Sequence, residues 1–375
     1  MCLLMQLLEE FRQKLLKVGR NEKMNVLMIG VDETSIGGML TVVNNYKNNK
    51  EFCKMTNLKY VATVIRSNKL VKIKTFLCKI PEIISTIRND KIDIVHVHMA
   101  ERGSVFREGF VVLLANVMGC KTVIHMHGAD IEDWYNKQFV LIKKLIANIF
   151  CAADVMIVLG DNWLPFMRSV MVGHEEKIKV LHNAVYVEAE NKANANATDI
   201  LFYGMLIKRK GIEDLLAAFE RIKDDIPKNI HLRLYGDNKE FDVLKKLKEY
   251  HLEERASYEG WMTSEKRQTV FSNTLINVLP SYNEGLPMTI LESMGYGIPN
   301  ISTNIAAIPE AITDGVNGFT IEPGDVDSLA EKMKNLILHK DLWVKFSNNA
   351  YETAKNEFSI KTHFAQLMKI YEQIM

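Results

Sequence analysis

The sequence predicts an α/β protein in which two doubly wound domains face a cleft. Short apolar runs that are typical of buried strands alternate with amphipathic helical segments, and this alternation occurs twice along the chain. Between the two stretches, residues 188–199 are polar, rich in Asn and Ala, and without a periodic apolar face, so we predict a linker there. The chain has 375 residues, 47% of them apolar, which is long enough for two substantial cores.

Charge and cysteine content narrow the function classes. Lys and Arg total 47 against 46 for Asp and Glu, so no overall field attracts nucleic acid. No apolar run approaches the ~20 residues that span a bilayer. We expect a cytoplasmic protein without a nucleic-acid partner, and peripheral contact with the inner face of the membrane is an open alternative. The cysteines have no CxxC spacing, which favours a reducing compartment over a disulfide framework or zinc site: Cys2, Cys53, Cys78, Cys120 and Cys151.

Residues 1–23 form an N-terminal extension with apolar residues at helical spacing. The acids Glu9 and Glu10, and the lack of a basic leader, make it a poor secretory signal. We interpret it as a surface helix or a misassigned start, because Met24 directly precedes a strong first strand. A helix that binds a membrane surface or a partner is the alternative.

The first domain is assigned to residues 24–187, where the predicted strands are continuous apolar runs. These strands are residues 25–31, 59–65, 92–98, 122–127, 155–159 and 178–181, and helices are predicted at 70–88, 139–153 and 161–171. The helix at 70–88 is basic. We interpret its lysines as a solvated face, with contact to anionic lipid as the alternative: Lys69, Lys72, Lys74 and Lys79.

A glycine pair, Gly37 and Gly38, follows the first strand and precedes a predicted helix. The pattern is not GxGxxG, so the fingerprint of NAD-binding domains is absent. The pair either lets a helix N-terminus approach a diphosphate or simply makes a turn.

Two neighbouring strands end in alternating histidines, His96 with His98 and His125 with His127. Residues i and i+2 share a strand face, which raises a metal hypothesis, but no cysteine or carboxylate at catalytic-zinc spacing accompanies them. A histidine at the ligand edge of a parallel sheet more often donates a hydrogen bond. His127 is the best candidate to meet substrate, because the following Gly128 leaves the backbone open.

The second domain is assigned to residues 200–355, and it carries a candidate phosphate site at residues 279–299. An apolar strand ends there in a loop of Pro, Ser, Asn and Gly, and Pro287 then marks the start of a helix. Such a helix N-terminus favours anions, and Gly285 permits close approach of a ligand. Two carboxylates, Glu284 and Glu292, flank this position; because they repel phosphate, we expect them to bind hydroxyls. The implied ligand carries both phosphate and sugar.

Two further features belong to this half. The basic cluster of residues 208–210 follows the domain's first strand, so its cations point to the same crevice. Near the C-terminus, Asp325 and Asp327 form a DxD pattern at the start of a predicted helix, where we expect helix capping rather than metal binding. The remaining residues, 356–375, are predicted to be a C-terminal helix.

Several of these motifs together resemble glycosyltransferase family 4. They are residues 202–216, with the sequence FYGMLIKRKGIEDLL, residues 279–287, Glu292, and residues 308–325. The resemblance runs from about Met24 to the C-terminus. It implies the GT-B fold of two Rossmann-like domains and retaining transfer of a sugar from a nucleotide donor, typically without a required metal. It further implies that the last helix crosses back to the first domain.

The resemblance also implies roles for single residues of the second domain. Lys210 contacts the donor diphosphate, the Gly285 and Leu286 amides meet the donor sugar or phosphate, Glu284 lies beside the donor sugar, and Glu292 binds the ribose.

From the first domain, the resemblance places Gly37 and Gly38 over the diphosphate and His127 at the reacting centre. It places Asn183 at the junction of the domains, although Ala184 and Tyr186 replace the Gly and Asp that are more usual after it.

The chain also departs from the family at Met205, where many members have Arg. A cation ~5 Å from a diphosphate oxygen contributes roughly 3 kcal/mol at an effective dielectric constant of about 20. We therefore expect Arg209 or Lys208 to supply this charge.

These observations lead to one preferred function and two alternatives. The preferred function is transfer of a hexose or N-acetylhexosamine from a nucleotide-diphosphate sugar to a polysaccharide, lipid-linked or other glycan acceptor, with Lys210, Glu284 and His127 at the reacting centre. We favour positioning by Glu284 over covalent catalysis. The alternatives are a nucleotide-sugar epimerase on the same fold and a non-catalytic subunit that binds a partner.

Overall fold

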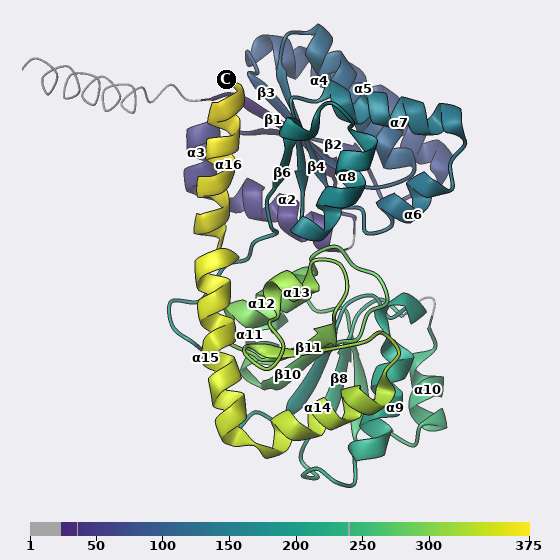
Figure 1. Ribbon diagram of the computed structural model, residues 1–375, viewed down its shortest axis with the longest axis vertical. Helices are drawn as coiled ribbons and strands as arrows, with labels where there is room; N and C mark the ends of the chain where they lie inside the picture. The colour runs from purple at the N-terminus through teal and green to yellow at the C-terminus, as the bar shows by residue number, and fades with distance from the viewer. Residues whose placement is uncertain (1–23, 36, 239–240) are drawn as a thin grey trace, which may run out of the picture.

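The computed structural model describes residues 24–35, 37–238 and 241–375, and it confirms two α/β domains (Figure 1). Each domain is built on a six-stranded parallel sheet with helices on its faces. The predicted N-terminal extension, residues 1–23, lies outside the described residues. Within the described part of the chain, no helix is both long enough and apolar enough to cross a membrane.

The first sheet has the strand order β2-β1-β3-β4-β5-β6. The central strands β1, β3, β4 and β5 are almost entirely buried, as expected when helices cover both faces of a parallel sheet, whereas the edge strands β2 and β6 are partly buried. Their bounds are β1 Val26–Val31, β2 Lys59–Val64, β3 Ile94–Met99, β4 Lys121–Met126, β5 Val155–Val158 and β6 Ile178–Val180.

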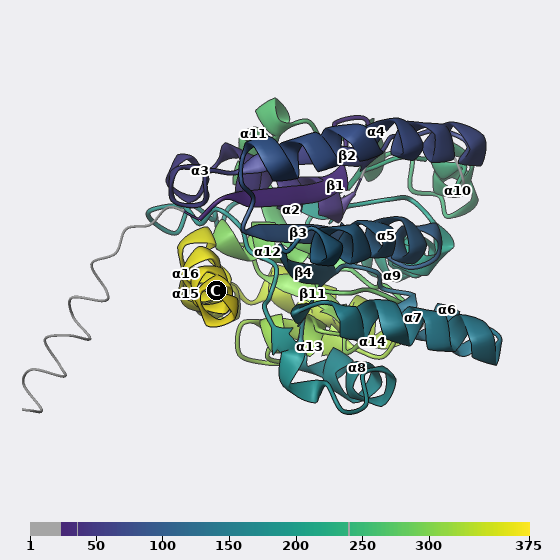
Figure 2. The same cartoon turned by 90° about the horizontal axis from the view of Figure 1, so that it is seen from above.

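Helices cover this sheet on both faces, and α4, α5 and α7 lie side by side on one of them (Figure 2). The segment predicted as one helix at residues 161–171 divides into a 3-10 turn and α8, because Pro165 has no N–H to continue the α-helical hydrogen bonds. The elements are α2 Gly38–Asn48, α3 Lys50–Thr56, α4 Lys69–Asn89, α5 Gly103–Val117, α6 Ile131–Asn136, α7 Val140–Ala152, η1 Asp161–Trp163, α8 Leu164–Val170 and η2 Glu175–Lys177.

The second sheet has the order β12-β11-β10-β7-β8-β9. Its strands are β7 Asp199–Tyr203, β8 His231–Tyr235, β9 Ala256–Gly260, β10 Thr274–Leu279, β11 Asn300–Thr303 and β12 Gly318–Ile321. Its helices are η3 Lys208–Lys210, α9 Ile212–Ile222, α10 Val243–Glu249, α11 Ser264–Ser272, α12 Met288–Gly295, α13 Ile308–Ala311 and α14 Val326–Leu338. Asp325 caps α14 by accepting a hydrogen bond from the Ser328 backbone N–H at 3.0 Å, which confirms the capping prediction for the DxD pattern.

The chain ends in two helices, α15 Lys340–Glu357 and α16 Ile360–Ile374, which run along both domains (Figure 1). Helix α15 packs against α12 of the second domain, whereas α16 lies on the first. His363 Nε2 lies 2.6 Å from the hydroxyl of Tyr46, and the hydroxyl of Tyr371 lies 2.6 Å from His96 Nδ1. The last helix therefore completes the core of the first domain. The exact domain boundaries at residues 187, 199 and 355 stay a prediction.

We expect Tyr371→Phe to lower the free energy of unfolding by about 1–3 kcal/mol, because it leaves the buried His96 Nδ1 without its hydrogen-bond partner. Urea denaturation would measure the change. The matched control is Tyr186→Phe, whose side chain is exposed and which should change stability by less than about 0.5 kcal/mol. Equal effects of the two variants would contradict the role given to Tyr371.

Candidate functional site

A cavity of about 340 Å³ lies between the two domains. Loops that follow β1, β3 and β4 of the first sheet and β7 and β10 of the second contribute to its walls. The structure brings all the predicted site residues together here: Gly37, Gly38, His127, Arg209, Lys210, Glu284, Gly285, Leu286 and Glu292. The carboxyl ends of the strands of both sheets therefore border one cavity. Ligand sites of parallel α/β sheets lie at this end of the strands.

The glycine pair brings the first domain against the second. Gly37 has a φ of +118°, which a residue with a side chain rarely adopts. A Cβ on Gly38 would lie 3.3 Å from Cγ of Met288, the first residue of α12. The N-terminus of α2 therefore approaches the N-terminus of α12, and both helices direct unpaired backbone N–H groups into the region of the cavity.

The loop between β10 and α12 is held from both domains. Asn183 donates a hydrogen bond to the Leu286 carbonyl at 2.9 Å. A Cβ on Gly285 would lie 3.3 Å from Cδ1 of Leu159, so a larger residue would push against the first domain. Pro287 is the N-cap of α12, so the helix begins at Met288, one residue later than predicted. Asn183 therefore lies at the junction of the two domains, which is the position that the family resemblance implies for it.

The basic turn η3 is bonded to the same loop between β10 and α12. Lys210 Nζ lies 2.5 Å from Glu284 Oε1, and the exposed fractions of the two side chains are only 16% and 7%. The Tyr282 backbone N–H donates to the Arg209 carbonyl at 2.8 Å, and Arg209 Nη1 donates to the Asn283 carbonyl at 2.6 Å. The two loops together present cations and backbone amides to the cavity.

Gly211 permits this contact between the loops. It has a φ of +70°, and a Cβ there would lie 1.9 Å from the carbonyl oxygen of Pro280. Any larger residue would separate Lys210 from Glu284. Of the two cations proposed to replace the missing Arg at Met205, Arg209 lines the cavity together with Met205 itself, whereas Lys208 does not.

Glu292 lies in the second turn of α12 with its side chain almost fully buried. Burial raises the pKa of its carboxyl to about 7, although Arg267 Nη1 lies 3.0 Å from Oε1 and acts in the opposite direction. The other oxygen, Oε2, has no hydrogen-bond partner among the described residues. Glu292 therefore has a buried oxygen, unpaired within the described part of the chain, beside the cavity that the residue lines.

His127 follows β4 and lies at the edge of a buried stack of imidazole rings. Its Nε2 lies 2.8 Å from His98 Nδ1, and its ring centroid lies 4.3 Å from that of His125. Burial, with a smaller contribution from His363, lowers the pKa of His127 to about 3. His127 is therefore neutral at physiological pH and offers a hydrogen bond rather than a positive charge.

Beneath His127, the side chains of His96, His98 and His125 form the cluster that raised the metal hypothesis. One ring nitrogen of each lies within 4.8 Å of the others, and all three rings are buried. The residues in this group are neutral ligands only, and burial lowers each pKa. A buried dication would gain no compensating negative charge from them. That the protein needs no metal stays a prediction.

Sequence reasoning missed several residues of the cavity. Asn283 donates a hydrogen bond to Asp130, which links the two domains across the cavity, and Glu101, two residues after the end of β3, lines the cavity. The position of Glu101 after a buried strand was a usable signal. The partner of Glu292, Arg267, gave none, because it lies on a polar helix 25 residues earlier in the chain.

Comparisons with known proteins agree with this geometry. Residues 187–353 match the family described as glycosyl transferases group 1. An uncharacterized 41.2 kDa protein in the cps region of Klebsiella pneumoniae is 26% identical over 373 residues, which cover 93% of this chain and 99% of that protein. UDP-Gal:alpha-D-GlcNAc-diphosphoundecaprenol alpha-1,3-galactosyltransferase of Escherichia coli is 25% identical, covering 83% of this chain and 82% of that enzyme.

Among solved structures, HepE of Anabaena in complex with UDP superimposes with a TM-score of 0.73 at 16% identity. The match covers 93% of this chain and all of that one, 100%. The fold is GT-B. Together with the family match and the enzymes named among the relatives, it supports a glycosyltransferase.

We expect the stability of the protein to depend on the ionisation of Glu292. The folded-state pKa of about 7 lies above the ordinary value of 4.5, so the folded protein binds this proton more tightly than the unfolded chain does. The stabilisation is complete below the lower value and is lost as pH rises through the higher one. Relative to Glu292→Gln, the wild type should lose up to about 3 kcal/mol of unfolding free energy across this window.

Denaturant unfolding of both proteins at about pH 5 and about pH 8 would measure this difference. Comparing the two pH values removes any constant effect of the substitution on Arg267. Glu265→Gln, at an exposed position on α11, is the control. Parallel pH profiles for the wild type and Glu292→Gln would refute the assignment.

Proposed function

We propose that this protein is a retaining glycosyltransferase of the family 4 type. It would transfer a hexose or N-acetylhexosamine from a nucleotide-diphosphate sugar to a glycan or lipid-linked acceptor. The observation that carries the proposal is the convergence, in one cavity between two GT-B domains, of a cationic loop, two helix N-termini and a buried carboxylate with a free oxygen.

The second domain offers groups for each part of the donor. Lys210, Arg209 and the amides of Gly285 and Leu286 would hold the diphosphate, with the α12 N-terminus behind them. The unpaired Oε2 of Glu292 would accept a hydrogen bond from a ribose hydroxyl. The similar HepE structure contains UDP, which supports a uridine diphosphate sugar as the donor.

The reaction breaks the bond between the anomeric carbon and the diphosphate oxygen and forms a bond from that carbon to an acceptor oxygen. The leaving diphosphate takes the acceptor proton, so the charges balance without a protein base. Lys210 and the loop amides stabilise the negative charge that develops on the leaving group. Closure of the domains around the cavity would exclude water and so prevent hydrolysis.

Glu284 is better suited to positioning than to covalent attack. Its Oε1 contacts Lys210 and accepts a hydrogen bond from Ser281 Oγ at 2.7 Å, so these two groups hold the carboxylate in a fixed orientation. When a phosphate binds Lys210, Glu284 is released in part to contact the donor sugar. Neutral His127, from the opposite domain, would hydrogen-bond the same sugar near the anomeric carbon.

The acceptor belongs to the first-domain side of the cavity, where Glu101 and Asp130 lie. The Escherichia coli relative is named for a lipid-linked sugar diphosphate as acceptor. We extend this acceptor class to the present protein: a glycan, free or linked through diphosphate to a lipid.

We expect Lys210→Ala to lower kcat/KM for the donor by roughly 10²–10³, because it removes a cation from the developing diphosphate charge. Arg209→Ala should cause a loss of the same kind. The matched control is Lys228→Ala, which changes an exposed lysine of the second domain and should leave kcat/KM for the donor unchanged. A loss with Lys208→Ala but not Arg209→Ala would show that the wrong cation was assigned.

Nucleoside-diphosphate release from a panel of sugar nucleotides, with soluble and lipid-linked acceptors, would test the reaction itself. We expect acceptor-dependent release that is unchanged by EDTA, with the α-anomeric configuration of the donor kept in the product. Conversion of the donor sugar without any acceptor would instead show an epimerase. Loss of turnover in EDTA that Mg²⁺ or Mn²⁺ restores would contradict the metal-free mechanism.

A further inference from the structure

The ring of His127 has one nitrogen committed to the interior of the first domain. Its Nε2 lies 2.8 Å from Nδ1 of His98, which is on the neighbouring strand β3. His127 also lines the cavity, so Nδ1 is the ring nitrogen that remains for a ligand there. Because a neutral imidazole carries a single N–H, the bond made by Nε2 decides whether Nδ1 can donate or accept.

The bond between the two imidazoles can run in either direction. Burial lowers the pKa of both His98 and His127, so each ring is neutral at physiological pH and has one proton to place. If His98 donates from Nδ1, the proton of His127 is on its own Nδ1, where a ligand can accept it. If His127 donates from Nε2, its Nδ1 is only an acceptor and the proton of His98 is on Nε2. One proton of His98 therefore sets the hydrogen bonding at the cavity.

The surroundings of His98 distinguish these two arrangements. The residue is 1% exposed, and its Nε2 is buried without a hydrogen-bond partner among the described residues. A proton on Nε2 would be a buried N–H group without an acceptor, whereas a proton on Nδ1 is used in the bond to His127. Buried N–H groups without a partner are rarer in folded proteins than acceptors with unused lone pairs, and burying an unpaired polar group is costly. The proton of His98 therefore belongs on Nδ1.

The ring of His98 is held between other aromatic rings. It stacks on His96 at 4.9 Å and on His125 at 5.3 Å between ring centroids, and the ring of Tyr46 lies 5.5 Å away. His96 is in turn fixed by the hydroxyl of Tyr371, 2.6 Å from its Nδ1. A flip of the His98 ring, which would move Nδ1 away from His127, would have to displace this packing.

The two strands also fix where the rings of His98 and His127 meet. His98 pairs with His125 in the register of β3 and β4, and the backbone N–H of His127 donates to the Met99 carbonyl at 2.7 Å. His125 and His127 are two residues apart, so their side chains lie on the same side of the chain. The ring of His127 is therefore stacked on His98, with 5.1 Å between centroids and 28° between planes.

We propose that His98 is a positioning residue for the reacting centre. It keeps its proton on Nδ1, donates a hydrogen bond to Nε2 of His127, and so holds His127 as a neutral N–H donor to an oxygen atom of the bound sugar. That a sugar is the ligand rests on the proposed function, whereas the position of the proton does not. A neutral donor orients a sugar hydroxyl without adding a positive charge beside the carbon at which positive charge develops.

The first test locates the proton in the absence of any substrate. Nitrogen NMR of the full chain with isotope-labelled histidine distinguishes ring nitrogens that carry a proton from those that do not. His127→Asn identifies the signals of His127 by their loss. We expect the wild type to show His127 protonated at Nδ1 and unprotonated at Nε2 near neutral pH. A proton on Nε2 of His127, or a doubly protonated ring, would overturn the proposal.

The second test replaces His98 with two side chains of similar shape. Asparagine can place an amide N–H near the position of Nδ1, whereas leucine has no donor. We expect His98→Leu to lower kcat by roughly five- to tenfold, the effect of one hydrogen bond, with little change in KM for the sugar nucleotide. His98→Asn should restore most of this loss. Equal losses in the two variants would show that His98 acts by packing alone, which contradicts the proposal.

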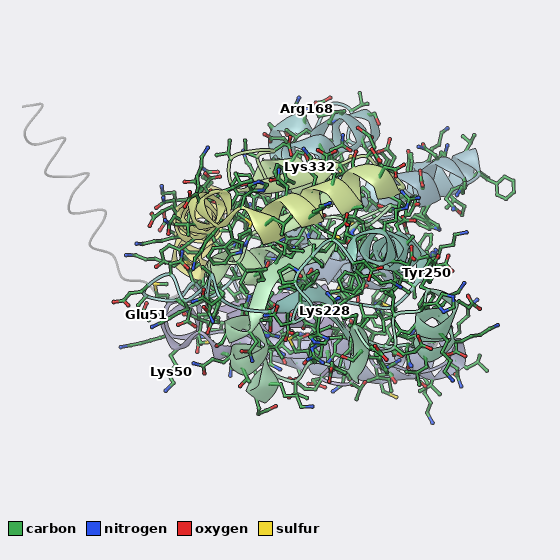
Figure 3. All side chains as sticks on the ribbon, turned by 90° about the horizontal axis from the view of Figure 1, so that it is seen from below. Lys50, Glu51, Arg168, Lys228, Tyr250 and Lys332 are labelled. Atoms are coloured by element: carbon green, nitrogen blue, oxygen red, sulfur yellow. The ribbon has the colours of Figure 1, made fainter. Side chains whose placement is uncertain are left out.

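Two controls separate this role from general destabilisation. In a His127→Asn background, His98→Leu should cause no further loss of kcat, because the group that it positions is gone. A further loss of the full size would refute the coupling. His339→Gln changes an exposed histidine directly after α14, the helix that carries Lys332 on the lower face of the second domain (Figure 3), and should have the kcat of the wild type.

The NMR measurement uses the wild type, so it decides the position of the proton even if a His98 variant does not fold. Far-UV circular dichroism shows which variants are folded. The expected proton on Nδ1 of His127, without sugar transfer from any donor, would overturn the proposed function and leave the assignment of the proton intact.

Discussion

The ion pair between Lys210 and Glu284 is the interaction on which the candidate site depends. Both side chains are largely buried, and each is the ion-pair partner of the other. The desolvation of two charges is compensated only while they remain together. The pair therefore holds the cationic loop against the β10–α12 loop, and a bound phosphate would replace Glu284 as the partner of Lys210. Ligand binding and loop geometry are thus coupled through one contact.

The same contact explains why glycine stands at several positions around the cavity. Gly211 permits the approach to Pro280, and Gly38 and Gly285 permit the approach of one domain to the other. A Cβ on Gly211 would meet the Pro280 backbone, whereas a Cβ on Gly38 or Gly285 would meet a side chain of the other domain, so the wall has bare backbone at these positions. Such a wall suits a ligand recognised by its oxygen atoms.

The parts of the site that the sequence predicted are local ones. Strand, loop and helix start follow one another within residues 274–288, and the residue types there specify each conformation directly. The order of strands then brings Lys210 and Glu284 to the same edge of one sheet. The fold class could therefore be predicted in full. The predicted site residues also gather in the cavity, although Glu101 and Asp130, which line it too, were not predicted.

Side-chain pairing across elements could not be predicted. Glu292 requires Arg267 and His98 requires His127, and each pair is decided by packing angles that no local pattern encodes. The histidines were visible as alternating residues, but whether they hold a metal, titrate or pack as neutral rings depends on the burial of the whole stack. That burial depends in turn on α16, more than 230 residues away in the chain.

The position of α16 has a consequence for the order in which the chain is made. The first domain is synthesised first, but the side chains that close its core beside β3, His363 and Tyr371, leave the ribosome after the sheet of the second domain. Until then, the side chains of Tyr46 and His96 lack their hydrogen-bond partners, and the core of the first domain is not covered on the side where α16 packs. The sheet of the second domain packs against α14, and Trp343 of α15 donates a hydrogen bond to the Leu275 carbonyl of β10; both helices precede α16 in the chain. The half of the protein that is translated second can therefore finish folding first.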